Sequence, residues 1–84
     1  MHYVYVLKSE KDHELSVGYS EDLQERVRAH NAGEVPATRP RRPLRLVFYE
    51  AYGAKSDAKR REQYLKTSKG SATLRLMLRD TLQG

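Results

Sequence analysis

Hydrophobic and polar residues follow two different patterns along the chain, and the first pattern indicates β-strands. Residues 2–7 are rich in tyrosine and valine, a composition that favours a strand over a helix of one or two turns. Residues 15–19 are similar, and the short polar segment between the two predicts an antiparallel hairpin with a longer loop. The apolar segment 44–51 predicts a third strand, placed at the centre of the sheet.

The second pattern has the periodicity of α-helices. Ser20, followed by two acidic residues, predicts the N-cap of a helix over about residues 21–31. Ser56 predicts the cap of a second helix over about 57–67, and residues 67–70 are expected to break that helix. From Ser71 onward, leucines and a methionine recur at helical spacing, which predicts a final amphipathic helix packed on the sheet.

The predicted element order is therefore ββαβαα. It corresponds to an α+β fold in which a small three-stranded antiparallel sheet is flanked by helices. With 84 residues, we expect a single domain over residues 1–84 with one small core, and a site assembled from a few packed elements. No repeat or long linker divides the chain.

Composition narrows the possible functions. The chain has 16 Lys+Arg against 11 Asp+Glu, a formal charge of +5, which points to a polyanionic partner such as nucleic acid. The absence of cysteine excludes disulfides, thiolate nucleophiles and cysteine-rich zinc sites. The early charged residues do not suit a signal peptide, and no apolar run reaches membrane length, so we expect a cytoplasmic protein without a membrane partner.

Charged residues occupy positions where the helical pattern expects apolar ones. Arg26 and His30 share the apolar face of the first helix, and Glu62 lies in the middle of the inward stripe of the second. One explanation is an internal salt bridge between Arg26 and Glu62. The other is a shared cleft to which both helices contribute from the same face of the sheet. Such a cleft would combine an arginine that binds phosphate with a carboxylate that holds Mg²⁺.

Five segments, in order and with their spacing, resemble the small GIY-YIG nucleases: residues 3–5, 16–19, 22–33, 42–47 and 58–66. The likeness spans most of the chain. It is greatest to short stand-alone proteins that resemble the nuclease domain of the excision-repair incision subunit. No phosphate-binding loop and no nucleophile elbow is present, which disfavours P-loop hydrolases and serine hydrolases.

The resemblance implies a metal-dependent endonuclease that hydrolyses phosphodiesters in nucleic acid, with DNA as the expected substrate. Tyr5 matches the first motif tyrosine, Arg26 the arginine and His30 the histidine that follows it. Glu62 matches the ligand of Mg²⁺ or Mn²⁺. The implied mechanism is a one-step hydrolysis in which a tyrosine oxygen helps to activate the attacking water.

Two features depart from the family pattern. Ser16 stands before Gly18 where the second motif has a tyrosine, and no asparagine follows Asn31. Tyr19 cannot replace the lost phenol directly, because strand alternation turns it to the opposite face. Losing a group that positions or deprotonates water typically costs about 10²- to 10⁴-fold in rate, so we expect weakened activity.

The alternative is a catalytically impaired nucleic-acid-binding module that keeps the fold, and a weaker one is a basic protein-interaction domain. In either nucleic-acid reading, binding is predicted to rest on basic residues in the loops and helix ends beside the cleft: Arg39, Arg41, Arg42, Lys66 and Lys69.

Overall fold

The computed structural model describes residues 1–83 and confirms the predicted α+β class and order of elements. The antiparallel strands are β1 (His2–Ser9), β2 (Leu15–Ser20) and β3 (Leu44–Tyr52). They lie in the order β2-β1-β3, so the prediction that the third strand is central is wrong. The central strand is β1, which is buried continuously from Val4 to Ser9 because both of its faces are covered.

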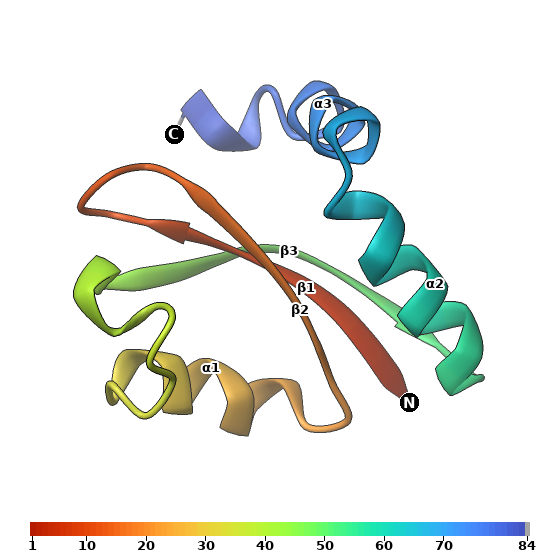
Figure 1. The fold of residues 1–84 in the computed structure, drawn as a ribbon, viewed down its shortest axis with the longest axis horizontal. Coiled ribbons are helices and arrows are strands. Elements are labelled where there is room, and N and C mark those ends of the chain that lie inside the picture. The colour runs from red at the N-terminus through yellow and green to blue at the C-terminus, as the bar shows by residue number, and fades with distance from the viewer. Residues whose placement is uncertain (84) are drawn as a thin grey trace.

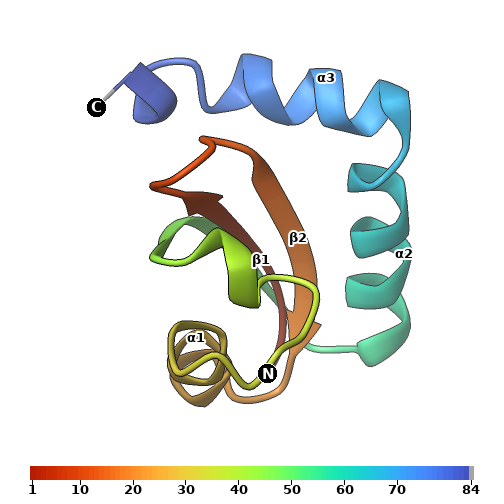
Figure 2. The ribbon, with the colours of Figure 1, turned by 60° about the vertical axis from the view of Figure 1, so that its left-hand side comes forward.

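The sheet lies between helices on its two faces (Figures 1 and 2). The helices are α1 (Leu23–Asn31), α2 (Lys55–Leu65) and α3 (Ser68–Met77). Alternate residues of β1 belong to two separate cores: Val4 and Val6 pack with α2 and α3, whereas Tyr5 and Leu7 pack with α1. The first and second helices therefore lie on opposite faces, although one shared face was expected.

The helices also begin at other residues than predicted. The N-cap of α1 is Asp22, whose side chain accepts a hydrogen bond from a backbone N–H of the first turn, and not Ser20. The second helix already begins at Lys55, without a side-chain cap. The third begins at Ser68, because Thr67 caps it where a break was expected. Within residues 1–83, no helix is both long and apolar enough to cross a membrane.

The connection between α1 and β3 is held against the sheet, which matters because it borders the site described below. It contains a short 3₁₀ helix, η1 (Arg39–Arg41). The Ser9 hydroxyl donates to the Arg41 carbonyl oxygen at 2.7 Å, and the Asn31 side chain bonds both backbone groups of Leu44, at 2.8 and 2.9 Å. These bonds fix the start and the end of the connection.

Candidate active site

A cleft of about 520 Å³ runs along β2, an edge strand of the sheet. Because no strand within residues 1–83 pairs with the outer edge of β2, side chains from both faces of the sheet reach the cleft around that edge. Most of the predicted site residues line it: Tyr5, Ser16, Gly18, Arg26, His30, Arg41, Glu62 and Lys66. The expected convergence on one cleft is therefore present, although the helices approach it from opposite faces.

Three of the predicted basic residues lie outside this cleft. Arg39 and Arg42 border a separate groove together with Lys11, and Lys69 is exposed in the first turn of α3. Only Arg41 and Lys66 of the predicted basic set line the cleft itself. The basic side chains thus form an inner pair and an outer group.

The position of Tyr5 depends on a glycine in the neighbouring strand. Gly18 is the register partner of Tyr5, and the phenol lies directly over it. A Cβ atom added to Gly18 would be 2.3 Å from the Tyr5 Oη, closer than such atoms approach each other. The glycine of the second motif therefore makes room for the tyrosine of the first, and Tyr5 itself is almost completely buried.

A chain of hydrogen bonds runs from Tyr5 into the protein. The Tyr5 Oη lies 2.9 Å from His30 Nε2, and His30 Nδ1 lies 2.7 Å from the Thr38 hydroxyl. Burial lowers the pKa of His30, and the neighbouring Arg26 charge lowers this pKa further, so the imidazole is neutral near pH 7. A neutral imidazole donates from one nitrogen and accepts at the other.

The Thr38 hydroxyl favours one of the two tautomers. Its oxygen lies 3.5 Å from the Val35 carbonyl oxygen, to which the hydroxyl donates. A hydroxyl that donates there accepts from His30 Nδ1–H, and we assign this tautomer on that ground. His30 Nε2 is then the acceptor for the proton of the Tyr5 phenol.

Arg26 and Glu62 do not form the internal salt bridge considered from the sequence. Arg26 Nε donates to the Tyr5 Oη at 3.2 Å. Glu62 is instead paired with two lysines, Lys59 of its own helix at 3.0 Å and Lys66, the C-cap residue of that helix, at 2.9 Å. Burial alone would raise the pKa of Glu62, but the hydrogen bonds from Lys66 and Lys59 outweigh burial, and the pKa is lowered.

Ser16 lies on the same side of β2 as Gly18 and faces an arginine. Its hydroxyl accepts a hydrogen bond from Arg41 Nη1 at 3.1 Å. The same guanidinium donates from Nε to the Asp12 carboxylate at 3.0 Å. Arg41 was expected in a loop beside the cleft, but no pattern in the sequence linked it to Ser16.

Two polar residues of the cleft, Lys59 and Thr38, were not singled out from the sequence. Lys59 lies three residues before Glu62 on the helix, a spacing that could have indicated the pair. Thr38 carries no recognisable signal. Tyr19 lies on the opposite face to Ser16, as alternation predicts, yet it lines the cleft around the strand edge, with the Lys59 ammonium 4.8 Å from its ring centroid.

The donor set suits a lightly coordinated metal ion. Within residues 1–83, no group of three or more His, Cys, Asp or Glu side chains is placed to hold a metal. The single carboxylate of Glu62 is nevertheless an oxygen ligand of the kind that Mg²⁺ prefers, and Mg²⁺ in proteins often keeps most of its waters. The residues therefore fit a Mg²⁺ or Mn²⁺ ion held by one carboxylate.

The chain is similar to proteins of one known family. Residues 1–75 match the family model described as the GIY-YIG catalytic domain. A UPF0213 protein of Staphylococcus haemolyticus is 40% identical over 77 residues, which cover 90% of this chain and 93% of that protein. A UPF0213 protein of Staphylococcus aureus strain N315 is 42% identical with the same coverage.

A solved structure is similar as well. The solution NMR structure of the UPF0213 protein BH0048 from Bacillus halodurans shares 33% sequence identity with this chain and superposes with a TM-score of 0.57. The match covers 90% of this chain and 83% of that one.

Proposed function

The chain belongs to the GIY-YIG catalytic domain family, and we propose that it is a metal-dependent endonuclease that hydrolyses phosphodiesters in nucleic acid, with DNA as the substrate. The observation that carries this proposal is the meeting of the Tyr5–His30 pair, Arg26 and Glu62 in one cleft. A buried tyrosine bonded to a neutral histidine can move a proton, and the arginine and carboxylate suit a phosphate and its metal ion.

In the proposed reaction, a water molecule attacks the phosphorus atom and the opposite phosphorus–oxygen bond breaks. The Tyr5 oxygen accepts a proton from the attacking water while the phenol proton passes to His30 Nε2. The bond from His30 Nδ1 to Thr38 holds the imidazole in the tautomer that this transfer requires. The departing oxygen takes its proton from solvent.

Arg26 would bind the phosphate while it orients the phenol. Its Nε donates to Tyr5, and the two terminal nitrogens of this exposed guanidinium form a fork that matches two phosphate oxygens. Glu62 would hold the metal ion, which supplies positive charge that stabilises the departing oxygen.

The alternative remains a nucleic-acid-binding module with little or no hydrolysis. Ser16 favours it, because the second phenol of the family is missing. Cleavage assays distinguish the endonuclease from the binding module. The substrates are labelled duplex, branched and single-stranded DNA and RNA, incubated with Mg²⁺ or Mn²⁺. Cleavage by wild-type protein that is lost in Glu62→Gln and kept in Glu25→Gln supports the enzyme. Glu25 is a suitable control because it is ion-paired to Arg28 outside the cleft.

A further inference from the structure

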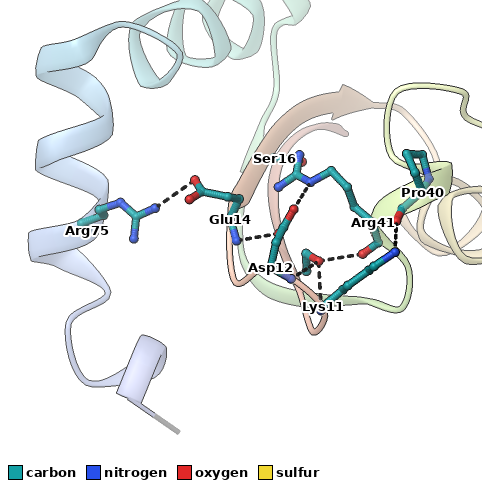
Figure 3. Close-up of polar contacts among 8 residues, drawn as sticks. Lys11, Asp12, Glu14, Ser16, Pro40, Arg41 and Arg75 are labelled. Carbon is teal, nitrogen blue, oxygen red and sulfur yellow. Dashed lines mark hydrogen bonds and ion pairs between the residues drawn. The ribbon is translucent and has the colours of Figure 1, made fainter.

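The Arg41 guanidinium forms part of the cleft wall and is held from two directions (Figure 3). Nε donates to Asp12 and Nη1 donates to Ser16, at 3.0 and 3.1 Å. The third nitrogen, Nη2, is the only fully buried side-chain nitrogen or oxygen without a hydrogen-bond partner within residues 1–83. The side chain as a whole is 26% exposed, so it lies at the wall of the cleft and not in a sealed core.

A buried donor on a charged group is normally paired in folded proteins, because leaving it unpaired is unfavourable. The hydrogen bonds to Asp12 and Ser16 keep this one in place. Because Nη2 itself has almost no accessible surface, a phosphate in the cleft would reach the guanidinium from its exposed side, as an acceptor of the right charge. The arrangement is that of a donor positioned before its acceptor arrives.

Ser16 and Arg41 are also sterically linked. A tyrosine at position 16 would place its ring where the guanidinium now lies, because Nη1 is only 3.1 Å from the first side-chain atom beyond the serine Cβ. The serine thus provides both room and an acceptor for Arg41. A tyrosine side chain at position 16 and the present position of the Arg41 guanidinium would therefore compete for the same space.

We propose that Arg41 occupies the place of the missing phenol as a phosphate-binding residue, with Asp12 and Ser16 as its positioning residues. An arginine cannot accept a proton from water, so it replaces the phenol in space and in phosphate contact, and Tyr5 alone serves as the proton acceptor. This inference rests on the proposed function for its substrate. It distinguishes Arg41 from Arg39 and Arg42, which lie outside the cleft.

Phosphate binding tests the inference without any cleavage. In nuclear magnetic resonance titrations with inorganic phosphate, the side-chain Nε–H of Arg41 and the amide of Ser16 should shift together. Arg41→Gln should weaken both phosphate and DNA binding by about tenfold or more, as expected for a charged hydrogen bond. Arg41→Lys should recover only part of this affinity, because a lysine cannot span Asp12, Ser16 and a phosphate.

Arg60→Gln is the matched control, since it removes the same charge from an exposed ion pair with Asp57 outside the cleft. If Arg41→Gln and Arg60→Gln weaken phosphate and DNA binding equally, the inference is wrong while the nuclease proposal stands. If wild-type protein binds no nucleic acid, the nuclease proposal fails, and the phosphate titration still decides whether Arg41 binds phosphate.

The steric link has a separate test. Ser16→Tyr alone should lower the melting temperature without raising the cleavage rate, because the ring collides with Arg41. In the double variant Ser16→Tyr with Arg41→Ala, the melting temperature should recover, and cleavage should exceed that of the Arg41→Ala single variant by about tenfold or more. A single Ser16→Tyr variant that is stable and faster than wild type would overturn the proposed exchange.

Discussion

The two walls of the cleft are built on different physical principles. The α1 wall, made of Tyr5, Arg26, His30 and Thr38, is held by side-chain hydrogen bonds that centre on a nearly buried phenol. The α2 wall, made of Lys59, Glu62 and Lys66, is a carboxylate between two ammonium groups that are themselves about half exposed. Both walls place polar groups beside β2, but only the first fixes them.

This difference predicts how each wall behaves when a substrate arrives. Hydrogen bonds between buried neutral groups are little affected by salt and keep one geometry, as a proton-transfer chain needs. Ion pairs with exposed partners are weak and exchange readily with other ions. We therefore expect a bound phosphate to draw the lysines away from Glu62 and to leave the carboxylate to a metal ion.

The largest effect should come from the carboxylate of the α2 wall. Glu62→Gln keeps the shape but removes the charge that attracts the cation, so cleavage should fall by about 10³-fold or more, the equivalent of several kcal/mol of metal stabilisation. DNA binding should persist or tighten, because the carboxylate no longer repels phosphate. Cleavage assays and fluorescence anisotropy measure the two quantities. Undiminished cleavage by Glu62→Gln would remove Glu62 from the proposed site.

On the α1 wall, Tyr5→Phe keeps the buried ring and removes only the hydroxyl between Arg26 and His30. We expect a fall in single-turnover rate of about 10²- to 10⁴-fold, the range for a lost general base. Tyr49→Phe is a suitable control, because Tyr49 pairs with Tyr5 across the sheet but is exposed and lies outside the cleft. Equal rates for the two variants would contradict the assigned role of the phenol.

A methyl group at Gly18 should break the geometry of the α1 wall without touching its chemistry. Gly18→Ala places a Cβ where the Tyr5 hydroxyl lies, so the phenol must move or the strands must separate, at a cost of about 1–3 kcal/mol. Gly53→Ala is the matched control, because its Cβ would meet nothing within 4 Å. Chemical denaturation measures the free energy of unfolding of both. If Gly53→Ala lost more unfolding free energy than Gly18→Ala, the close approach of the Tyr5 phenol to Gly18 would be refuted.

The walls should also respond to acid in different pH ranges. The pKa of His30 is lowered in the folded protein, so the folded state binds this proton less tightly than the unfolded state. The stability contribution is complete above the unfolded pKa of about 6.5 and is lost as the pH falls below it, by at most about 1.4 kcal/mol per pH unit. The pKa of Glu62 is also lowered, and its contribution is lost only below about pH 4.5.

Between pH 7 and pH 5, the free energy of unfolding should therefore depend less steeply on pH in His30→Gln than in wild type. Denaturation curves recorded at several pH values measure this dependence. His13→Asn is the control, because His13 lies in an exposed turn with a positive φ that asparagine tolerates. If the two variants keep the same pH dependence as wild type, His30 does not titrate as proposed.

The sequence predicted most polar residues of both walls and missed one in each, Thr38 in the α1 wall and Lys59 in the α2 wall. Arg26 and His30 stand out because they interrupt an apolar helical face, and Gly18 stands out because it follows the motif position. The side of the sheet on which each helix packs could not be predicted. Helix periodicity indicates which face of a helix is buried, but not which face of the sheet covers that helix. The prediction that the third strand is central was also wrong, because the strand that is covered on both faces is β1.

The contact between Ser16 and Arg41 joins residues 25 positions apart. Arg41 belongs to a segment without periodicity, so no local pattern relates it to a strand residue. The pairs of Glu62 with Lys59 and Lys66 are different, because spacings of three and four residues place them together on any helix. The sequence spacing alone therefore indicates that both lysines can pair with Glu62.

The smallest expected effect concerns these lysines and tests whether the α2 wall is exchangeable. In the double variant Lys59→Ala with Lys66→Ala, Glu62 has no ammonium partner, so Mn²⁺ should bind more tightly in the absence of DNA. An increase of about fivefold is expected, because exposed ion pairs are worth about 0.2–1 kcal/mol each. Arg60→Ala, which removes another three-residue ion pair of the same helix, should change Mn²⁺ affinity little. Electron paramagnetic resonance of free Mn²⁺ measures all three proteins.

In the wild-type protein, DNA binding should have the same effect on Glu62 as this double substitution. Phosphates that pair with Lys59 and Lys66 release Glu62, so a DNA duplex should raise the Mn²⁺ affinity of wild-type protein, and by linkage Mn²⁺ should raise its DNA affinity by the same factor. In the double variant this coupling should shrink toward the direct attraction between phosphate and metal. Equal coupling in both proteins would mean that the lysines do not restrain Glu62, and the α2 wall would then be as fixed as the α1 wall.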